Sequence, residues 1–196
     1  MSKWDKWDHR YLQLARNVAS WSKDPNAVVG AVIVNEVRDR VIALGFNGFP
    51  VGIEDDTERL YDSDVKNEMV IHAEQNALLF AGRKAKGCSI YVSGKPVCAR
   101  CAVLIIQAGI TRVVARKPKE EPIVVSSPNE VTGCKCNGKT ESKWDVSGRR
   151  AWGMFIEAGI DLVDTSHLDE GDIQPDKFNL EAREAVLAEI LGTKII

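Results

Sequence analysis

The sequence lacks any apolar run that approaches the roughly 20 residues of a membrane span. Its first residues, MSKWDKWD, are charged and contain no apolar core of a signal peptide. We therefore expect a cytoplasmic protein with no membrane partner. An excess of basic charge is lacking as well, because 26 Lys and Arg face 28 Asp and Glu, which gives a formal net charge of −2. No nucleic-acid partner is expected, since a dedicated nucleic-acid binder usually carries a basic field.

Cysteine and histidine are scarce, with five and three copies in 196 residues. Two of the cysteines form the pair Cys98-Ala-Arg-Cys101. In a reducing compartment this spacing suggests metal binding or redox catalysis before a structural disulfide. The length and the 44% hydrophobic content suffice for one domain with a proper core, so residues 1–196 are expected to form a single domain.

Apolar patterning predicts alternating strands and helices along most of the chain. Helices are expected at 8–21, 67–82, 99–109, 149–159 and 178–191, and strands at 27–34, 40–48, 88–94, 110–116 and 160–164. Residues 49–66 are polar and loop-like, 117–147 indicate an insertion or long loop, and 165–196 form a C-terminal helical extension. Strand–helix–strand alternation favours an α/β fold with parallel pairing and right-handed crossovers.

Three potential metal ligands fall at the starts of two predicted helices. His72 lies near the start of helix 67–82, and Cys98 and Cys101 lie at the start of helix 99–109. Two strands running in parallel would bring both helix starts to one edge of the sheet. One imidazole and two thiolates fill three zinc positions and leave the fourth for water, which is the pattern of a catalytic site. The sequence therefore predicts one catalytic zinc ion per chain.

Glu74 supplies the acid–base group that such a site needs. Near a helix start its side chain can approach the metal-bound water, whose pKa zinc lowers to about 7, without ligating the metal. The carboxylate then accepts the proton and delivers it to a ring nitrogen or a leaving amine. H-x-E followed by P-C-x-x-C is the signature of zinc nucleobase deaminases, and the present sequence reads HAE at 72–74 and PVCARC at 96–101. A redox interpretation of the cysteine pair leaves His72 and Glu74 unexplained.

With these motifs the chain resembles the deoxycytidylate (dCMP) deaminase family, within the cytidine deaminase superfamily. The resemblance rests on SKDPNAVVGAVIV (22–34), ALGFNGFPVGIEDD (43–56), HAEQNALLFAG (72–82), GCSIYVSGKPVCARCAVLIIQAGITRVV (87–114) and MFIEAGIDLVD (154–164). It implies a mixed five-stranded sheet flanked by helices in three α/β/α layers. It also implies hydrolysis of dCMP to dUMP, which feeds thymidylate synthesis. His72, Cys98 and Cys101 match the family's zinc ligands, and Glu74 matches its proton shuttle.

The resemblance also suggests residues that contact the substrate. Asn26 of SKDPN and Asn47 of GFNG match loops that line the nucleotide pocket, although both sequences make turns in any protein. Ala73 matches a position whose backbone faces the pyrimidine ring. Ser22 and Lys23 join Asn26 as candidates near the phosphate or the sugar.

Two departures from the family pattern stand near the cysteines. Val97 separates Pro96 from the first ligand, which puts the strand-to-helix turn in question but leaves the cysteine spacing intact. The insertion carries Cys134-Lys135-Cys136, which the family pattern does not place. A second metal shared with Cys88 or His167 is one interpretation of these cysteines, and ordinary loop thiols are the favoured one.

Assembly and regulation follow from the resemblance as well. Many relatives are homohexamers that dCTP activates and dTTP inhibits. The resemblance therefore also suggests Mg²⁺ bound together with a nucleoside triphosphate effector. The effector pocket of those relatives lies near Gly-Tyr-Asn-Gly, where this chain has Phe46. Helix 99–109 also offers more apolar surface than one side of a small sheet needs, at Ala102, Val103, Ile105, Ile106 and Ala108. A homo-oligomer is expected, with a hexamer favoured, unless the insertion or the terminal helix covers this surface.

Three alternatives share the zinc signature. The substrate could be another cytosine nucleotide, either dCTP or a 5-substituted dCMP. A tRNA adenosine deaminase would need phosphate-neutralising Lys and Arg, and the net charge argues against it. A zinc-stabilised protein that only binds nucleotides would be expected to lose the glutamate first, yet Glu74 is present.

Overall fold

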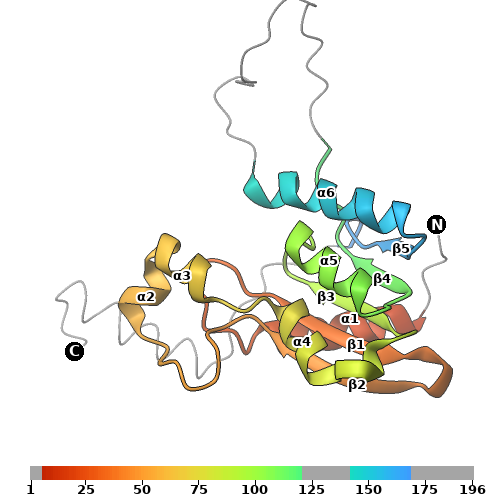
Figure 1. The fold of residues 1–196 in the computed structure, drawn as a ribbon, viewed down its shortest axis with the longest axis horizontal. Helices are drawn as coiled ribbons and strands as arrows, with labels where there is room; N and C mark the ends of the chain where they lie inside the picture. Colours follow the sequence, from red (N-terminus) through yellow and green to blue (C-terminus); the bar gives the residue numbers. More distant parts are fainter. Residues whose placement is uncertain (1–5, 121–141, 169–196) are drawn as a thin grey trace, which may run out of the picture.

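The computed structural model describes residues 6–120 and 142–168, which form a five-stranded sheet with helices on both faces (Figure 1). The strands are β1 (Gly30–Asn35), β2 (Arg40–Phe46), β3 (Ser89–Ser93), β4 (Arg112–Ala115) and β5 (Asp161–Asp164), in the spatial order β2-β1-β3-β4-β5. β1 is antiparallel to both β2 and β3, whereas β3, β4 and β5 are parallel to one another. The predicted mixed α/β sheet is confirmed.

Alternate side chains of the strands enter two separate apolar clusters, one on each face of the sheet. Helix α1 (Lys6–Ala19) covers one face, and α4 (Ala73–Ala81), α5 (Ala99–Gln107) and α6 (Lys143–Glu157) form the layer on the other (Figure 1). Val32, Tyr91 and Val114 pack in the α1 cluster, while their neighbours Ile33 and Ile90 pack in the cluster beneath α4 and α5. Burial on both faces explains why these strands read as continuous apolar runs.

An ion pair anchors α1 to the sheet. Arg112 of β4 donates from Nη1 to Asp8 Oδ1 at 2.6 Å and from Nη2 to Asp8 Oδ2 at 2.9 Å. Asp8 is almost completely buried, so its carboxylate needs this two-point contact. The hydroxyl of Tyr91 donates to the same carboxylate at 2.9 Å.

The predicted loop at 49–66 is wrong in part, because the structure contains two short helices there. These are α2 (Thr57–Tyr61) and α3 (Ser63–Met69). Asp56 caps the first by accepting from the backbone N–H of Arg59, and Asp62 caps the second through the N–H groups of Asp64 and Val65. Local capping by aspartate explains how such a polar stretch becomes helical.

The predicted continuous helix 67–82 is also wrong, because the chain leaves the helical conformation between Met69 and Ala73. Ile71 pairs there with Gly48 in an isolated antiparallel bridge, with N–H···O distances of 2.9 and 3.2 Å in the two directions. The break places His72 at the N-cap of α4, in an extended conformation with φ −71° and ψ 153°. The predicted zinc ligand His72 therefore lies at the N-terminal end of α4.

The segment after β4 differs in one boundary from the prediction. Helix α6 begins at Lys143, earlier than the expected 149, and Ser142 caps it by accepting from the N–H of Trp144. The remainder of the expected insertion, with Cys134 and Cys136, and the expected helix 178–191 lie outside the described residues. Within the described ranges, none of the helices has the length and apolarity that crossing a membrane requires.

Candidate metal centre and nucleotide site

Helix α4 is held directly against β2, which fixes the position of His72. A Cβ atom on Gly45 of β2 would lie 2.3 Å from the carbonyl oxygen of Ala73 and 2.5 Å from the nitrogen of Ala77. Only glycine permits this approach. Gln75 Oε1 accepts from the backbone N–H of His72 at 3.0 Å, which satisfies the N-cap donor.

The two helix starts meet at one edge of the sheet although their strands are not neighbours. β2 and β3 run in the same direction because each is antiparallel to β1, which lies between them. α4 follows β2, and α5 follows β3. Cys98 is the N-cap of α5, where its Sγ accepts from the N–H of Cys101 at 3.4 Å. The extra Val97 is buried and leaves this cap in place.

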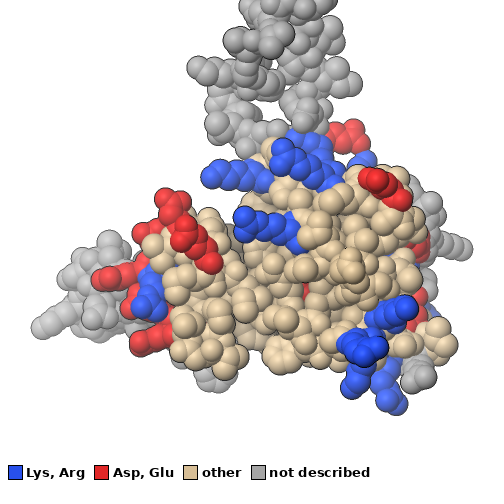
Figure 2. Space-filling model, viewed as in Figure 1, with Lys and Arg blue, Asp and Glu red and all other residues tan. Residues whose placement is uncertain are grey.

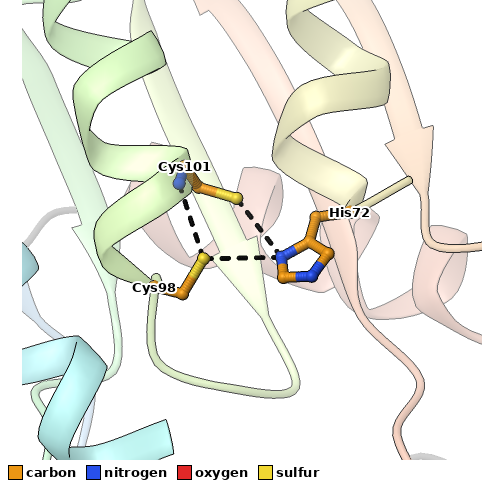
Figure 3. Close-up of side chains that lie close together, drawn as sticks. All are labelled: His72, Cys98 and Cys101. Carbon is orange, nitrogen blue, oxygen red and sulfur yellow. Dashed lines mark hydrogen bonds between the residues drawn. The ribbon is translucent and has the colours of Figure 1, made fainter. Parts of the chain in front are cut away.

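The side chains of His72, Cys98 and Cys101 converge with the spacing of a zinc site (Figure 3). His72 Nδ1 lies 3.5 Å from Cys98 Sγ and 3.4 Å from Cys101 Sγ. Tetrahedral zinc with usual Zn–N and Zn–S bonds separates nitrogen from sulfur by about 3.5 Å. The residues present therefore fit a zinc ion, and three protein ligands leave one position open.

Of the three groups, Cys98 is the one whose protonation state already favours metal binding. The Cys101 thiol donates to Cys98, which lowers the pKa of the Cys98 thiol to about 4 and raises that of Cys101. Hydrogen bonding to Cys98 raises the pKa of His72. A thiolate is thus already present at neutral pH, and it is the form that binds zinc.

Glu74 lies one residue beyond the start of α4 and is only 3% exposed. Burial raises the pKa of its carboxyl group above the usual range. A carboxylate with a raised pKa is better suited to take up and release protons near neutral pH. Its side chain interacts with that of Cys101, so it lies beside the ligand cluster.

A cavity of about 360 Å³ opens beside this cluster, a volume within the usual range for small-molecule sites. His72, Ala73 and Glu74 line one part of it, and Trp144 of α6 lines another. The Trp144 ring lies 5.8 Å from the His72 ring, at an interplanar angle of 40°. A partly apolar region of the cavity therefore adjoins the ligand cluster.

The predicted Asn26 and Asn47 both line the cavity, but in different ways. Asn26 is exposed, with a side chain available to a ligand. Asn47 is buried, accepts from the N–H of Val29 at 2.8 Å and donates to the carbonyl of Ala27 at 2.9 Å. Asn47 therefore holds the loop that carries Asn26.

Of the other predicted substrate contacts, Ala73, Ser22 and Lys23, only Ala73 lines the cavity. Ala73 is fully buried and lines the cavity. Ser22 is buried behind the lining, where its hydroxyl donates to the carbonyl of Asn47 at 2.8 Å. Lys23 does not line the cavity and forms an exposed ion pair with Asp55 at 2.7 Å.

Four charged or aromatic lining residues escaped the sequence analysis: Asp24, Lys66, Lys95 and Trp144. Lys66 lay in an expected loop and Trp144 in an expected insertion, so neither carried a signal. Lys95 precedes Pro96 and the ligand Cys98, and Asp24 belongs to SKDPN, so the sequence did place both beside candidate site residues.

A second metal finds no donor set in the described part of the chain. There the only group of three or more close ligand atoms is the one at His72. Cys88 is buried and donates from Sγ to the carbonyl of Lys84 at 3.2 Å.

Comparison with known proteins agrees with this geometry. Residues 5–117 match the family described as the cytidine and deoxycytidylate deaminase zinc-binding region. The chain belongs to this family. The match covers more than half of the sequence and includes the three candidate ligands and Glu74.

Two relatives illustrate the range of similarity within the family. The uncharacterised deaminase of the luxG 3′ region of Aliivibrio fischeri is 36% identical over 81% of this chain and 92% of its own length. Human deoxycytidylate deaminase is 41% identical over 58% of this chain. The match spans 66% of the human enzyme, just under two thirds of its length.

A solved structure shows the same fold. The dCMP deaminase of cyanophage S-TIM5, determined in complex with dCMP and dUMP, superimposes with a TM-score of 0.58. The similarity covers 84% of this chain and 100% of the phage enzyme, at 18% sequence identity. This likeness supports the cytidine deaminase-like arrangement of sheet and helices.

Proposed function

We propose that the protein is a zinc-dependent hydrolytic deaminase that converts dCMP and water to dUMP and ammonia, and so supplies dUMP for thymidylate synthesis. The observation that carries the proposal is the convergence of His72, Cys98 and Cys101 beside the buried Glu74, at one end of a cavity. Family membership and the relatives named deoxycytidylate deaminase support the same reaction.

The proposed mechanism assigns one task to each part of the cavity. His72, Cys98 and Cys101 would hold a zinc ion, which when bound would supply Lewis acidity that lowers the pKa of a water molecule to about 7. Glu74 takes one proton from the attacking water and delivers it to ring nitrogen N3. It then takes the second proton of that oxygen and delivers it to the amino group on C4, so that the C4–N bond breaks, C4=O forms and ammonia leaves. Ala73 and Trp144 line the region of the cavity in which the flat base would lie.

The charge around the cavity favours a mononucleotide over tRNA. Helices α2 and α3 carry a mainly acidic surface, visible at the left of Figure 2, in which the exposed Arg59 accompanies Glu58, Asp62, Asp64 and Glu68. Ser63 and Asn67 of α3 line the cavity, and Asp64 and Glu68 lie on the same short helix. A polyanion would need a basic surface there. The charge therefore favours a nucleotide deaminase over a tRNA adenosine deaminase.

Substrate comparison tests the proposal. We predict that dCMP has the highest specificity constant among dCMP, deoxycytidine, cytidine and dCTP, because buried polar groups in a site reject analogues that leave them unpaired. The measurement is kcat/KM from ammonia release for each compound, with 5-substituted dCMP included as the remaining alternative. Equal constants for cytidine and dCMP would refute selection of the monophosphate. Binding of dCMP without turnover would favour the non-catalytic alternative.

We also propose that the chain assembles into a homo-oligomer, with a hexamer favoured. Ala102 and Ile105 of α5 turn out to be buried against the sheet, but Val103 is 49% exposed. On the neighbouring α4, Leu79 and Phe80 are 71% and 74% exposed. Apolar side chains on two adjacent helices support a contact between subunits. Light scattering is expected to give several chains per particle, and a monomer would contradict the proposal.

Regulation by dCTP and dTTP, with Mg²⁺ on the triphosphate, remains part of the proposal, as does a cytoplasmic location. Phe46 lies at the end of β2, where its ring packs edge-on against Trp21 at 6.0 Å. Allostery requires that an effector bind two states with different affinity. Saturation curves for dCMP with and without each triphosphate are expected to differ in shape. Identical hyperbolic curves, with dTTP binding excluded by calorimetry, would contradict regulation.

A further inference from the structure

One cation that lines the cavity forms no ion pair with any other residue in the described part of the chain. Four ionisable side chains besides His72 line the cavity: Asp24, Lys66, Glu74 and Lys95. Lys66 Nζ lies 2.8 Å from Asp24 Oδ1, and both side chains are at most 7% exposed. This pair is therefore internally neutralised, and Glu74 is engaged at the ligand cluster.

Asp24 also explains why Lys66 is not available to a ligand. Its carboxylate accepts from the backbone N–H groups of Asn26 and Ala27, at 2.8 and 3.1 Å, and so shapes the loop beside the cavity. Withdrawal of Lys66 toward a ligand would leave a buried carboxylate without its cation, which is strongly unfavourable. Lys66 is thus committed to the loop.

Lys95 is in a different situation. It is half-buried in the segment between β3 and α5, and none of the ion pairs among the described residues includes it. The preceding Gly94 has φ +111°, and a Cβ there would lie 2.2 Å from the carbonyl oxygen of Val28. Pro96 follows and limits the backbone further. The segment is therefore braced against the loop that carries Asn26, and Lys95 lines the cavity.

We propose that Lys95 binds the 5′-phosphate of the nucleotide and thereby selects nucleoside monophosphates over nucleosides. The inference rests on the proposed deaminase function, whose substrate would be a phosphomonoester dianion. An ammonium group is a compact cation suited to a phosphate. The acidic side chains of α2 and α3 repel the same group, which also favours a position of the phosphate at Lys95.

The test compares Lys95→Gln with two matched variants. Lys95→Arg keeps the charge at the cavity. Lys84→Gln makes the same change at an exposed lysine of the 3₁₀ turn Gly82–Ala85, which is not among the cavity-lining residues. We expect Lys95→Gln to lower kcat/KM for dCMP by about 10- to 100-fold, the usual effect of losing a hydrogen bond to a charged group. Deoxycytidine, which has no phosphate, should be turned over as by the wild type. Lys95→Arg should recover most of the loss, and Lys84→Gln should show none.

A binding measurement separates this inference from the proposed reaction. Calorimetry with dUMP on the zinc-loaded protein needs no turnover, and Lys95→Gln should weaken dUMP binding by a similar factor. Added salt should weaken binding to the wild type more than to the variant, because screening acts on the lost charge pair. Equal dUMP affinity in the wild type and Lys95→Gln, an equal loss with deoxycytidine, or no dUMP binding by the wild type would each overturn the inference. Failure of dCMP turnover with Lys95-dependent dUMP binding would overturn only the reaction.

Discussion

Replacement of Glu74 by glutamine is expected to abolish deamination while zinc stays bound. The amide keeps the shape of the side chain but cannot accept a proton. General acid–base assistance contributes about 10²- to 10⁴-fold to a rate. Glu74 moves a proton more than once per cycle in the proposed mechanism, so the loss of kcat should lie at or above the upper end of that range. The buried position of the carboxylate leaves bulk water no easy route to replace it.

The measurement is kcat for dCMP together with zinc per chain by elemental analysis. Glu157→Gln, at the exposed C-terminal end of α6, makes the same chemical change away from the cavity and should behave as the wild type. A Glu74→Gln protein with near wild-type turnover would rule out the assigned proton transfer. Loss of zinc along with activity would show that Glu74 supports the ligand cluster instead.

Replacement of Cys101 by alanine is expected to remove both the metal and the activity. Cys101 is fully buried and lies 3.4 Å from His72 Nδ1 at the centre of the ligand cluster. Two remaining ligands cannot hold a catalytic zinc that normally has three. Zinc content should fall from one ion per chain to a small fraction, and dCMP turnover should fall to background.

Cys88→Ala is the matched control, because Cys88 is also buried but belongs to no ligand group in the described residues. It should retain one zinc per chain and measurable activity. Near-normal zinc in Cys101→Ala would contradict the ligand assignment. Full activity in a wild-type protein shown to be free of zinc would contradict the metal mechanism itself.

The ligand cluster could be predicted from the sequence because its parts are local. His72 with Glu74 and Cys98 with Cys101 are each close in the chain, and the strand–helix alternation brings the two motifs to one edge. The same alternation predicted the five strands. β2 and β3 run in the same direction, as expected, but they are not neighbours. β1 lies between them and is antiparallel to both.

The rest of the cavity could not be predicted, because it depends on contacts between distant residues. Lys66 and Asp24 are 42 positions apart, and the sequence around each residue does not indicate that they form an ion pair. The break before His72 depends on a bridge from Ile71 to Gly48, which overrides a helical pattern that runs through it. The SKDPN motif predicted that Lys23 would bind the phosphate or the sugar. In the structure, Lys23 instead forms an ion pair with Asp55 at the surface.

Hydrolysis of dCMP in water enriched in ¹⁸O is the most direct test of the proposed function. Purified protein with one zinc per chain is expected to release one ammonia for each dUMP, with one ¹⁸O atom at C4 of the uracil ring by mass spectrometry. Chelation should stop both products, and added zinc should restore them. A zinc-loaded protein that leaves dCMP unchanged, or that forms dUMP without solvent oxygen, would contradict hydrolytic deamination at this site.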